Sequence, residues 1–120
     1  MKIEGEGQLL RIFVGESDQW GGRPLHEAIV RKAREEGLAG ATVLRGLAGF
    51  GAHSRIHTAS VLRLSQDLPI VIEIVDSPER IERILPALDE MVQEGMMTME
   101  RVRIVSYRHG RDPSQDGGDS

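Results

Sequence analysis

The sequence of 120 residues contains no cysteine and only four aromatic residues, of which two are phenylalanine. The absence of cysteine excludes a disulfide framework, a thiol nucleophile and a cysteine-based zinc site. With so few aromatic rings, we expect no surface that stacks the bases of single-stranded nucleic acid. The formal net charge of -4 also argues against an overall basic surface for DNA or RNA. We therefore expect no nucleic acid among its partners.

Long hydrophobic runs are also lacking. The longest apolar runs are far shorter than the roughly 20 residues that a membrane-spanning helix requires. The polar start MKIEGEGQ lacks the apolar stretch of a secretory signal. We expect a cytoplasmic protein of one domain without direct membrane insertion, because a chain of this length supports one compact core.

The pattern of apolar residues predicts two helices and four strands. One helix is expected to have Pro24 in its first turn and Gly37 as its C-cap, and the other to run from the N-cap Ser77 to Gly95. Pro86 lies inside the second helix and predicts a kink or local break there. The strands are expected at residues 8–15, 40–47, 69–75 and 98–107. This order predicts an α+β, ferredoxin-like β-α-β-β-α-β fold, with an antiparallel sheet and two helices on one face.

The remaining segments set the expected domain boundaries. Residues 1–7 are rich in glycine and glutamate and are expected to fray, and the polar residues 109–120 are expected to form a disordered tail. The domain therefore spans residues 8–108. A long loop at about residues 47–66 separates the second and third strands, and loops of this length in a small domain are usually functional or mobile.

The first predicted strand is apolar on both faces, which two helices on one side of a sheet cannot cover. Either Leu9 and Phe13, or else Leu10, Ile12 and Val14, would lie on the uncovered face. A contiguous apolar patch of that kind normally marks an interface. We therefore expect a homo-oligomer, although the long loop or the termini could cover the same face instead.

The most informative feature is a segment without acidic residues in an acidic protein. No Asp or Glu occurs from Gly37 to Gln66, and this acid-free segment carries three arginines and two histidines. Glycines at its centre would let backbone N–H groups approach a phosphate, and arginine binds phosphate in a bidentate manner. The pattern indicates a site for a small anion, the alternative being a solvated loop. The residues concerned are Arg45, Gly46, Gly49, Gly51, His53, Arg55, His57 and Arg63.

Metal binding and catalysis have weaker support. His53 and His57 are four residues apart, but no carboxylate or cysteine joins them at ligand spacing, and His26 lies outside any HExxH pattern. The serines and threonines near these histidines lack a nucleophile elbow and an orienting acid. We therefore predict neither a resident metal nor a catalytic residue.

Three motifs point to a known family: GLAGATV at 37–43, GFG at 49–51 and DLPIVIEIVD at 67–76. The stretch from about Leu9 to Tyr107 resembles the nitrogen-regulatory PII signalling proteins, and more closely the PII-like group labelled domain of unknown function 190. The resemblance implies a ferredoxin-like homotrimer. It further implies that adenine nucleotides such as AMP, ADP or ATP bind in clefts between subunits, near the base of a long T-loop that engages a partner protein.

Carried over to this sequence, the resemblance places Gly49, Phe50 and Gly51 in the Gly-Phe-Gly motif and Thr42 at the matching position of the second strand. The T-loop corresponds roughly to residues 52–66. The sequence departs from PII proteins at residues 94–102, EGMMTMERV, which lack the glycine pair and lysine of the phosphate loop. The arginine-bearing segment that follows the last strand of PII proteins is also largely missing. Only Arg108 and Arg111 remain nearby, and Arg108 would supply charge to the ligand. These departures put triphosphate binding in doubt and leave AMP as a plausible ligand.

The predicted function is thus a trimeric, non-enzymatic PII-like sensor of an adenine nucleotide or another small anion. Two alternatives share the topology. A metal-binding or structural trimer of the CutA-like sort would bind no nucleotide. An acylphosphatase-type enzyme requires an arginine loop after the first strand and a partner asparagine, and although Arg23 is present the chain contains no asparagine.

Overall fold

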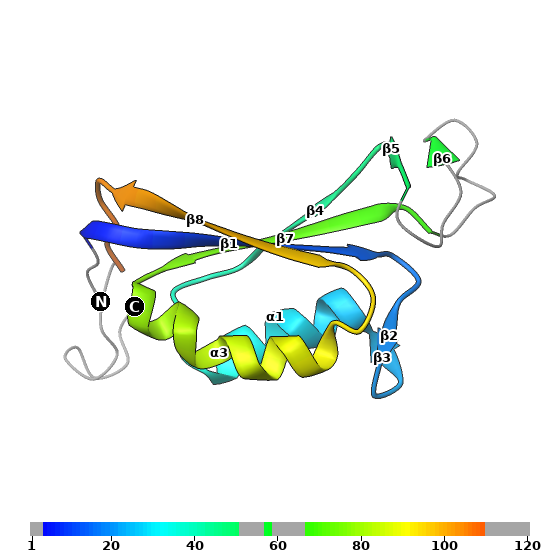
Figure 1. Ribbon diagram of the computed structural model, residues 1–120, viewed down its shortest axis with the longest axis horizontal. Coiled ribbons are helices and arrows are strands. Elements are labelled where there is room, and N and C mark those ends of the chain that lie inside the picture. The colour runs from blue at the N-terminus through cyan, green and yellow to red at the C-terminus, as the bar shows by residue number, and fades with distance from the viewer. Residues whose placement is uncertain (1–3, 51–56, 59–66, 110–120) are drawn as a thin grey trace.

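The computed structural model describes residues 4–50, 57–58 and 67–109. Its main feature is a four-stranded sheet of order β4-β7-β1-β8, in which every neighbouring pair is antiparallel. Two helices cover one face of this sheet and leave the other face open (Figure 1). The long elements are β1 (Gly5–Gly15), α1 (Leu25–Glu35), β4 (Thr42–Arg45), β7 (Pro69–Asp76), α3 (Pro78–Met91) and β8 (Met96–Ile104).

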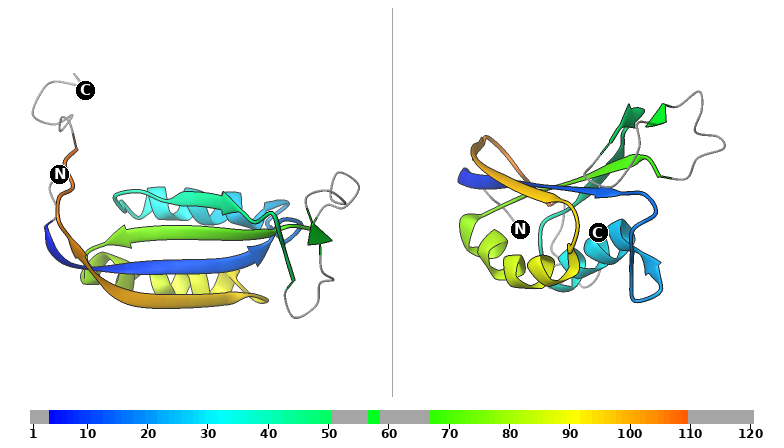
Figure 2. Two further views of the ribbon diagram at one scale, coloured as in Figure 1. Left: turned by 90° about the horizontal axis from the view of Figure 1, so that it is seen from above. Right: turned by 45° about the vertical axis from the view of Figure 1, so that its right-hand side comes forward.

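This arrangement confirms the predicted ferredoxin-like fold. The chain passes through strand, helix, strand, strand, helix and strand, and the first and third long strands lie at the centre of the sheet. Two small hairpins are added to this plan (Figures 1 and 2). They are formed by β2 (Gln19–Trp20) with β3 (Arg23–Pro24), and by β5 (Ala48–Gly49) with β6 (His57–Thr58).

The core lies between the helices and the sheet. Alternate residues of β1 and β7 face the helices, and the register places Ile12 opposite Ile72 and Leu10 opposite Ile74. All four side chains are essentially inaccessible to solvent. The helices contribute residues at helical spacing, which is why both bury one stripe and expose the other. These helix residues are Leu25, Ala28, Ile29, Ala33, Ile81, Ile84, Leu88 and Met91.

Local signals explain where the helices begin and end. Gly37 follows α1 with a positive φ of 78°, and its N–H donates to the Arg34 carbonyl oxygen over 3.1 Å, as expected of a C-capping glycine. The Ser77 hydroxyl accepts a hydrogen bond from the Arg80 N–H at the start of α3. Pro24 is the N-cap residue of α1 rather than part of its first turn.

Of the kink or local break predicted at Pro86, the local break does not occur, because α3 continues through this residue as one helix. Pro86 lies on the exposed side of the helix. The carbonyl group that loses its helical partner at this position therefore faces water, which limits the cost of the missing N–H.

Residues 5–7, which belong to the segment expected to fray, are the first residues of β1. Gly5 pairs with Ile104 and Gly7 pairs with Val102, so β8 holds this part of the chain in the sheet. The last strand also occupies 96–104 rather than 98–107, and the second strand is shorter than expected. Residues 51–56 and 59–66 of the predicted long loop lie outside the described residues, as do residues 110–120 of the predicted tail at 109–120.

Leu9 and Phe13 lie on the open face of the sheet, whereas Leu10, Ile12 and Val14 are buried against the helices. Of the two alternatives for β1, the helices therefore leave the Leu9 and Phe13 side uncovered. An ion-pair cluster divides these apolar residues. Arg11 Nε lies 3.0 Å from Glu73 Oε2 of β7, and Arg11 Nη1 lies 2.8 Å from Glu100 Oε1 of β8. The hydrogen bond to Glu73 raises the pKa of the Arg11 guanidinium. The open face is therefore amphipathic rather than uniformly apolar.

Neither helix in the described part of the chain has the length and apolar character needed to cross a bilayer.

Candidate functional site

The acid-free segment leaves the sheet at Arg45, the last residue of β4. Arg45 lies opposite Ile70 of β7, and its Nη2 forms an ion pair with Glu16 Oε2. The next residue, Gly46, donates its N–H to the Pro69 carbonyl oxygen over 2.8 Å. Arg45 therefore lies at one end of the sheet. At this end, the chain continues from β4 into β5 (Figure 1).

Two glycines pack closely against Pro69 at this end of the sheet. A Cβ atom added at Gly46 or at Gly49 would lie 3.0 Å from Pro69 Cγ, which is tighter than ordinary van der Waals contact. Gly49 also has a φ of +153°, a conformation that side chains rarely adopt. Both positions therefore favour glycine for structural reasons, and the backbone between them is brought close to the sheet end.

Exposed apolar side chains surround this backbone. Leu47 and Phe50 expose 76% and 69% of their surface, and Leu44 of β4 is also exposed. Large apolar side chains at such exposure normally cover a ligand or another chain. The combination of a guanidinium, glycine-rich backbone and apolar side chains can contact both the phosphate and the base of a nucleotide.

The turn after β1 contacts the chain on both sides of the expected long loop, at the end of β4 and just before β7. The Glu16 N–H donates to the Leu68 carbonyl oxygen over 2.8 Å. Ser17 donates both its N–H and its hydroxyl to Asp67 Oδ1, over 3.2 and 2.9 Å. Because Glu16 also pairs with Arg45, the same turn contacts both the end of β4 and the start of β7. We call Arg45, Gly46, Gly49 and Phe50, with this turn, the loop base.

The structure places the predicted site residues in two regions. Arg45, Gly46, Gly49 and Phe50 lie together at the loop base, whereas Thr42 lies at the other end of β4, on the open face opposite Glu73. Arg108 follows β8, whose last residue pairs with Gly5, so within one chain it lies at the opposite end of the sheet from Arg45. The remaining predicted residues, Gly51, Arg55 and Arg63, lie outside the described residues, as does His53.

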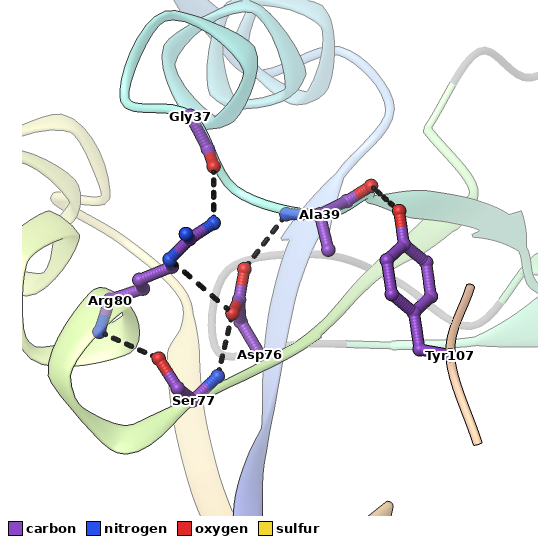
Figure 3. A network of polar contacts seen from close by, with 6 residues as sticks. All are labelled: Gly37, Ala39, Asp76, Ser77, Arg80 and Tyr107. Carbon is purple, nitrogen blue, oxygen red and sulfur yellow. Dashed lines mark hydrogen bonds and ion pairs between the residues drawn. The ribbon is translucent and has the colours of Figure 1, made fainter. Parts of the chain in front are cut away.

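A second polar network lies at that opposite end, around the buried carboxylate of Asp76 (Figure 3). Asp76 has no exposed surface, and its oxygens accept hydrogen bonds from the N–H groups of Ala39, over 2.8 Å, and Ser77, over 2.7 Å. Arg80 donates to the Gly37 carbonyl oxygen over 3.0 Å. The Tyr107 hydroxyl donates to the Ala39 carbonyl oxygen over 3.4 Å. This network fastens the loop between α1 and β4 to the start of α3.

The described residues do not gather a metal site. Across 4–50, 57–58 and 67–109, no three His, Cys, Asp or Glu side chains are grouped so that they could hold a metal ion.

Sequence reasoning missed the ion pair that Glu16 makes and the buried carboxylate of Asp76. Glu16 is separated from Arg45 by 29 residues, so no local spacing indicates their ion pair. Asp76 precedes a Ser-Pro helix start, and its position there does not distinguish a buried carboxylate from a solvated one. The acid-free segment itself gave a usable signal, because it contains Arg45, Gly46 and Gly49, which lie together at the loop base.

The sequence matches a known protein family over residues 7–104, namely domain of unknown function 190, described as "Uncharacterized ACR". A UPF0166 protein of Aquifex aeolicus is 37% identical over 98 residues, covering 82% of this chain and 92% of that protein. A UPF0166 protein of Methanocaldococcus jannaschii is 35% identical over 88 residues, covering 73% of this chain and 81% of its own length.

Among solved structures, the fold is similar to that of CPII, a nitrogen regulatory PII-like protein from Thiomonas intermedia K12. The structure of CPII bound to ADP, AMP and bicarbonate gives a TM-score of 0.64 at 16% identity, covering 82% of this chain and 88% of CPII. The structure of CPII bound to ADP and bicarbonate gives a TM-score of 0.62 at 17% identity over the same shares of the two chains. At this identity the likeness concerns the fold.

Proposed function

The chain belongs to the DUF190 family and has a PII-like fold, and from this premise we propose that it is a non-enzymatic sensor that binds an adenine nucleotide at the loop base. The sensor is a cytoplasmic homotrimer, and the nucleotide lies in the clefts between its subunits. Ligand binding changes how residues 47–66, the T-loop, are presented to a partner protein. Coupling of a bound ligand to a loop is an ordinary switching mechanism.

The observation that carries this proposal is the loop base itself. Arg45 provides a guanidinium, Gly46 and Gly49 bring backbone close to the end of the sheet, and Phe50 offers an exposed ring. A phosphate is bound well by a guanidinium and by backbone N–H groups, and an adenine ring is covered well by apolar side chains. Arg55, Arg63 and Gly51 extend the site in the proposal.

The ligand is AMP, ADP or ATP. The CPII structures hold ADP and AMP, which supports an adenine nucleotide as the class of ligand for the same fold. In this chain, residues 96–104 form a regular strand, β8, which begins directly after Gly95. The connection between α3 and β8 is therefore short. It leaves little backbone to surround a long polyphosphate, which favours a ligand with fewer phosphate groups.

The open face of the sheet supports association of copies, which in the proposal is a trimer. Phe13 and Val71 lie side by side on this face, with the exposed residues Leu44 and Met96 on either side of them. Burial of such apolar surface stabilises association by roughly 25 cal/mol for each Å² removed from water. The Arg11 ion pairs with Glu73 and Glu100 lie within one chain and balance charge at the centre of the face.

A trimer also accounts for the position of Arg108. Within one chain this residue lies far along the sheet from Arg45, so both can contact one ligand only if they come from different copies. Thr42 lies on the open face, and in the proposal it is part of the boundary between copies. A nucleotide at the boundary then links ligand binding to the arrangement of the subunits.

Isothermal titration calorimetry of the full chain against AMP, ADP and ATP tests the proposal. We expect saturable binding of at least one of these nucleotides, with one site for each subunit, and no heat with guanosine or cytidine nucleotides at the same concentration. An absence of heat with all three adenine nucleotides, at a protein concentration of about 0.1 mM, where a millimolar ligand is detectable, would overturn the proposal.

A further inference from the structure

Glu16 connects the proposed phosphate ligand Arg45 to the backbone at the start of β7. Its Oε2 forms the ion pair with Arg45 Nη2, and its Oε1 accepts a longer hydrogen bond of 3.5 Å from the Leu68 N–H. Its own N–H donates to the Leu68 carbonyl oxygen over 2.8 Å. Glu16 is thus fastened through its main chain as well as its side chain, and its carboxylate is held beside the guanidinium.

The two partners differ in their access to solvent. The side chain of Arg45 is 60% exposed, whereas that of Glu16 is 24% exposed. The guanidinium therefore keeps donors available on its outer side, because only Nη2 is occupied by Glu16. An anion that binds Arg45 from solvent meets the fixed negative charge of Glu16 directly behind the guanidinium.

We propose that Glu16 is a specificity-determining residue of the nucleotide site, acting as a fixed counter-charge that selects against ligands with more phosphate groups. The inference rests on the proposed function, because it concerns which nucleotide the same site accepts. Glu16 does not exclude phosphate, since it leaves one side of the guanidinium open. It reduces the charge that Arg45 offers, and the resulting penalty grows with the charge of the ligand.

Coulomb's law gives the expected selectivity. Near neutral pH, AMP carries about two negative charges and ATP about four. At a separation of about 7 Å in a water-like dielectric, one fixed charge changes the affinity by roughly three-fold for each unit of ligand charge. Removing the charge of Glu16 should therefore favour ATP over AMP by roughly ten-fold at low ionic strength, and salt should reduce this effect.

The test compares the affinities of AMP and ATP for the wild-type protein, Glu16→Gln and Glu36→Gln, by calorimetry in metal-free buffer at low salt. Glutamine keeps a side-chain oxygen that can accept the Leu68 N–H, so this variant removes charge and retains the tether. Glu36→Gln is the matched control, because it removes the same charge at the far end of α1, where Glu36 pairs with Lys32.

We expect Glu16→Gln to raise the ratio of ATP affinity to AMP affinity by roughly ten-fold, and Glu36→Gln to leave it within about two-fold. The charge-retaining Glu16→Asp should keep the wild-type ratio, which separates the effect of charge from that of side-chain size. If Glu16→Gln binds both nucleotides with the wild-type ratio, the inference is overturned while the proposed function stands. If none of the proteins binds AMP or ATP, and the wild-type protein does not bind ADP either, both are overturned.

Discussion

The carboxylate of Asp76 accepts a 2.8 Å hydrogen bond from the N–H of Ala39, 37 residues away in the sequence. Asp76 is fully buried at the junction of β7 and α3, and Ala39 lies in the loop that leads from α1 into β4. This contact therefore joins the two β-α-β halves at their turning points. A buried carboxylate is tolerated here because backbone N–H groups satisfy both of its oxygens.

Replacement of Asp76 by alanine should destabilise the fold. It leaves the N–H groups of Ala39 and Ser77 without their acceptor, and hydrogen bonds to a charged group contribute about 1.5–3 kcal/mol each. We expect the free energy of unfolding to fall by about 2–4 kcal/mol, measured by urea denaturation. Asp89→Ala, on the exposed side of α3, is the control and should change stability by less than about 0.5 kcal/mol. Equal stability of the two variants would contradict the structural role of Asp76.

Gly95, at the turn from α3 into β8, should not tolerate a side chain. Its φ is +149°, and an added Cβ would lie 2.5 Å from the Phe13 carbonyl oxygen, which belongs to the backbone of the central strand. We expect Gly95→Ala to lower the free energy of unfolding by about 2 kcal/mol or more. Gly40→Ala, with no atom within 4 Å of the added Cβ, should be neutral or stabilising by up to about 1 kcal/mol. Thermal melting of the two variants measures the difference. A melting temperature of Gly95→Ala equal to that of Gly40→Ala would contradict the prediction.

Arg45→Gln should weaken nucleotide binding without unfolding the protein. The side chain is largely exposed, and a hydrogen bond between two charged groups at a binding site is worth about 1.5–3 kcal/mol, so we expect affinity to fall roughly 10- to 100-fold. Arg83→Gln, on the exposed side of α3, changes the net charge equally and should leave affinity within about two-fold. Calorimetry with AMP measures both. An equal loss in the two variants would assign the effect to net charge rather than to the loop base.

The open face should be the surface that holds the copies together, and two methionines of β8 test this. Met96 lies opposite Phe13 on the open face and is 55% exposed, whereas Met99 lies opposite Leu10 on the helix side and is 41% exposed. Met96→Glu should convert the trimer to monomers, because it places a charge in an apolar interface. Met99→Glu should remain trimeric. Light scattering coupled to size-exclusion chromatography gives the subunit count, and a trimeric Met96→Glu would place the interface elsewhere.

Much of the fold could be predicted from local patterns. The alternation of Ile70, Ile72 and Ile74 identified a strand with one buried face, and Ser77 followed by Pro78 identified a helix start. The first three residues of β1 could not be predicted, because Gly-Glu-Gly has little intrinsic preference for a strand. Pairing with β8, nearly a hundred residues later, supplies the hydrogen bonds that hold it.

The candidate site was predictable only in part. The acid-free segment indicated where positive charge accumulates, and Arg45, Gly46 and Gly49 do lie together at the loop base. Composition treats all arginines of a region alike, however, and it gave no sign that Arg108 lies at the other end of the sheet. The pairing of Arg45 with Glu16 also depends on the register of β4 against β7, which no short stretch of sequence encodes.

Native mass spectrometry of the purified full chain, with AMP, ADP and ATP each added in turn, tests the central claim most directly, since it reports subunit number and bound ligand together. The account predicts a trimer that retains up to three copies of an adenine nucleotide. A chain that stays monomeric and binds none of the three nucleotides would contradict it.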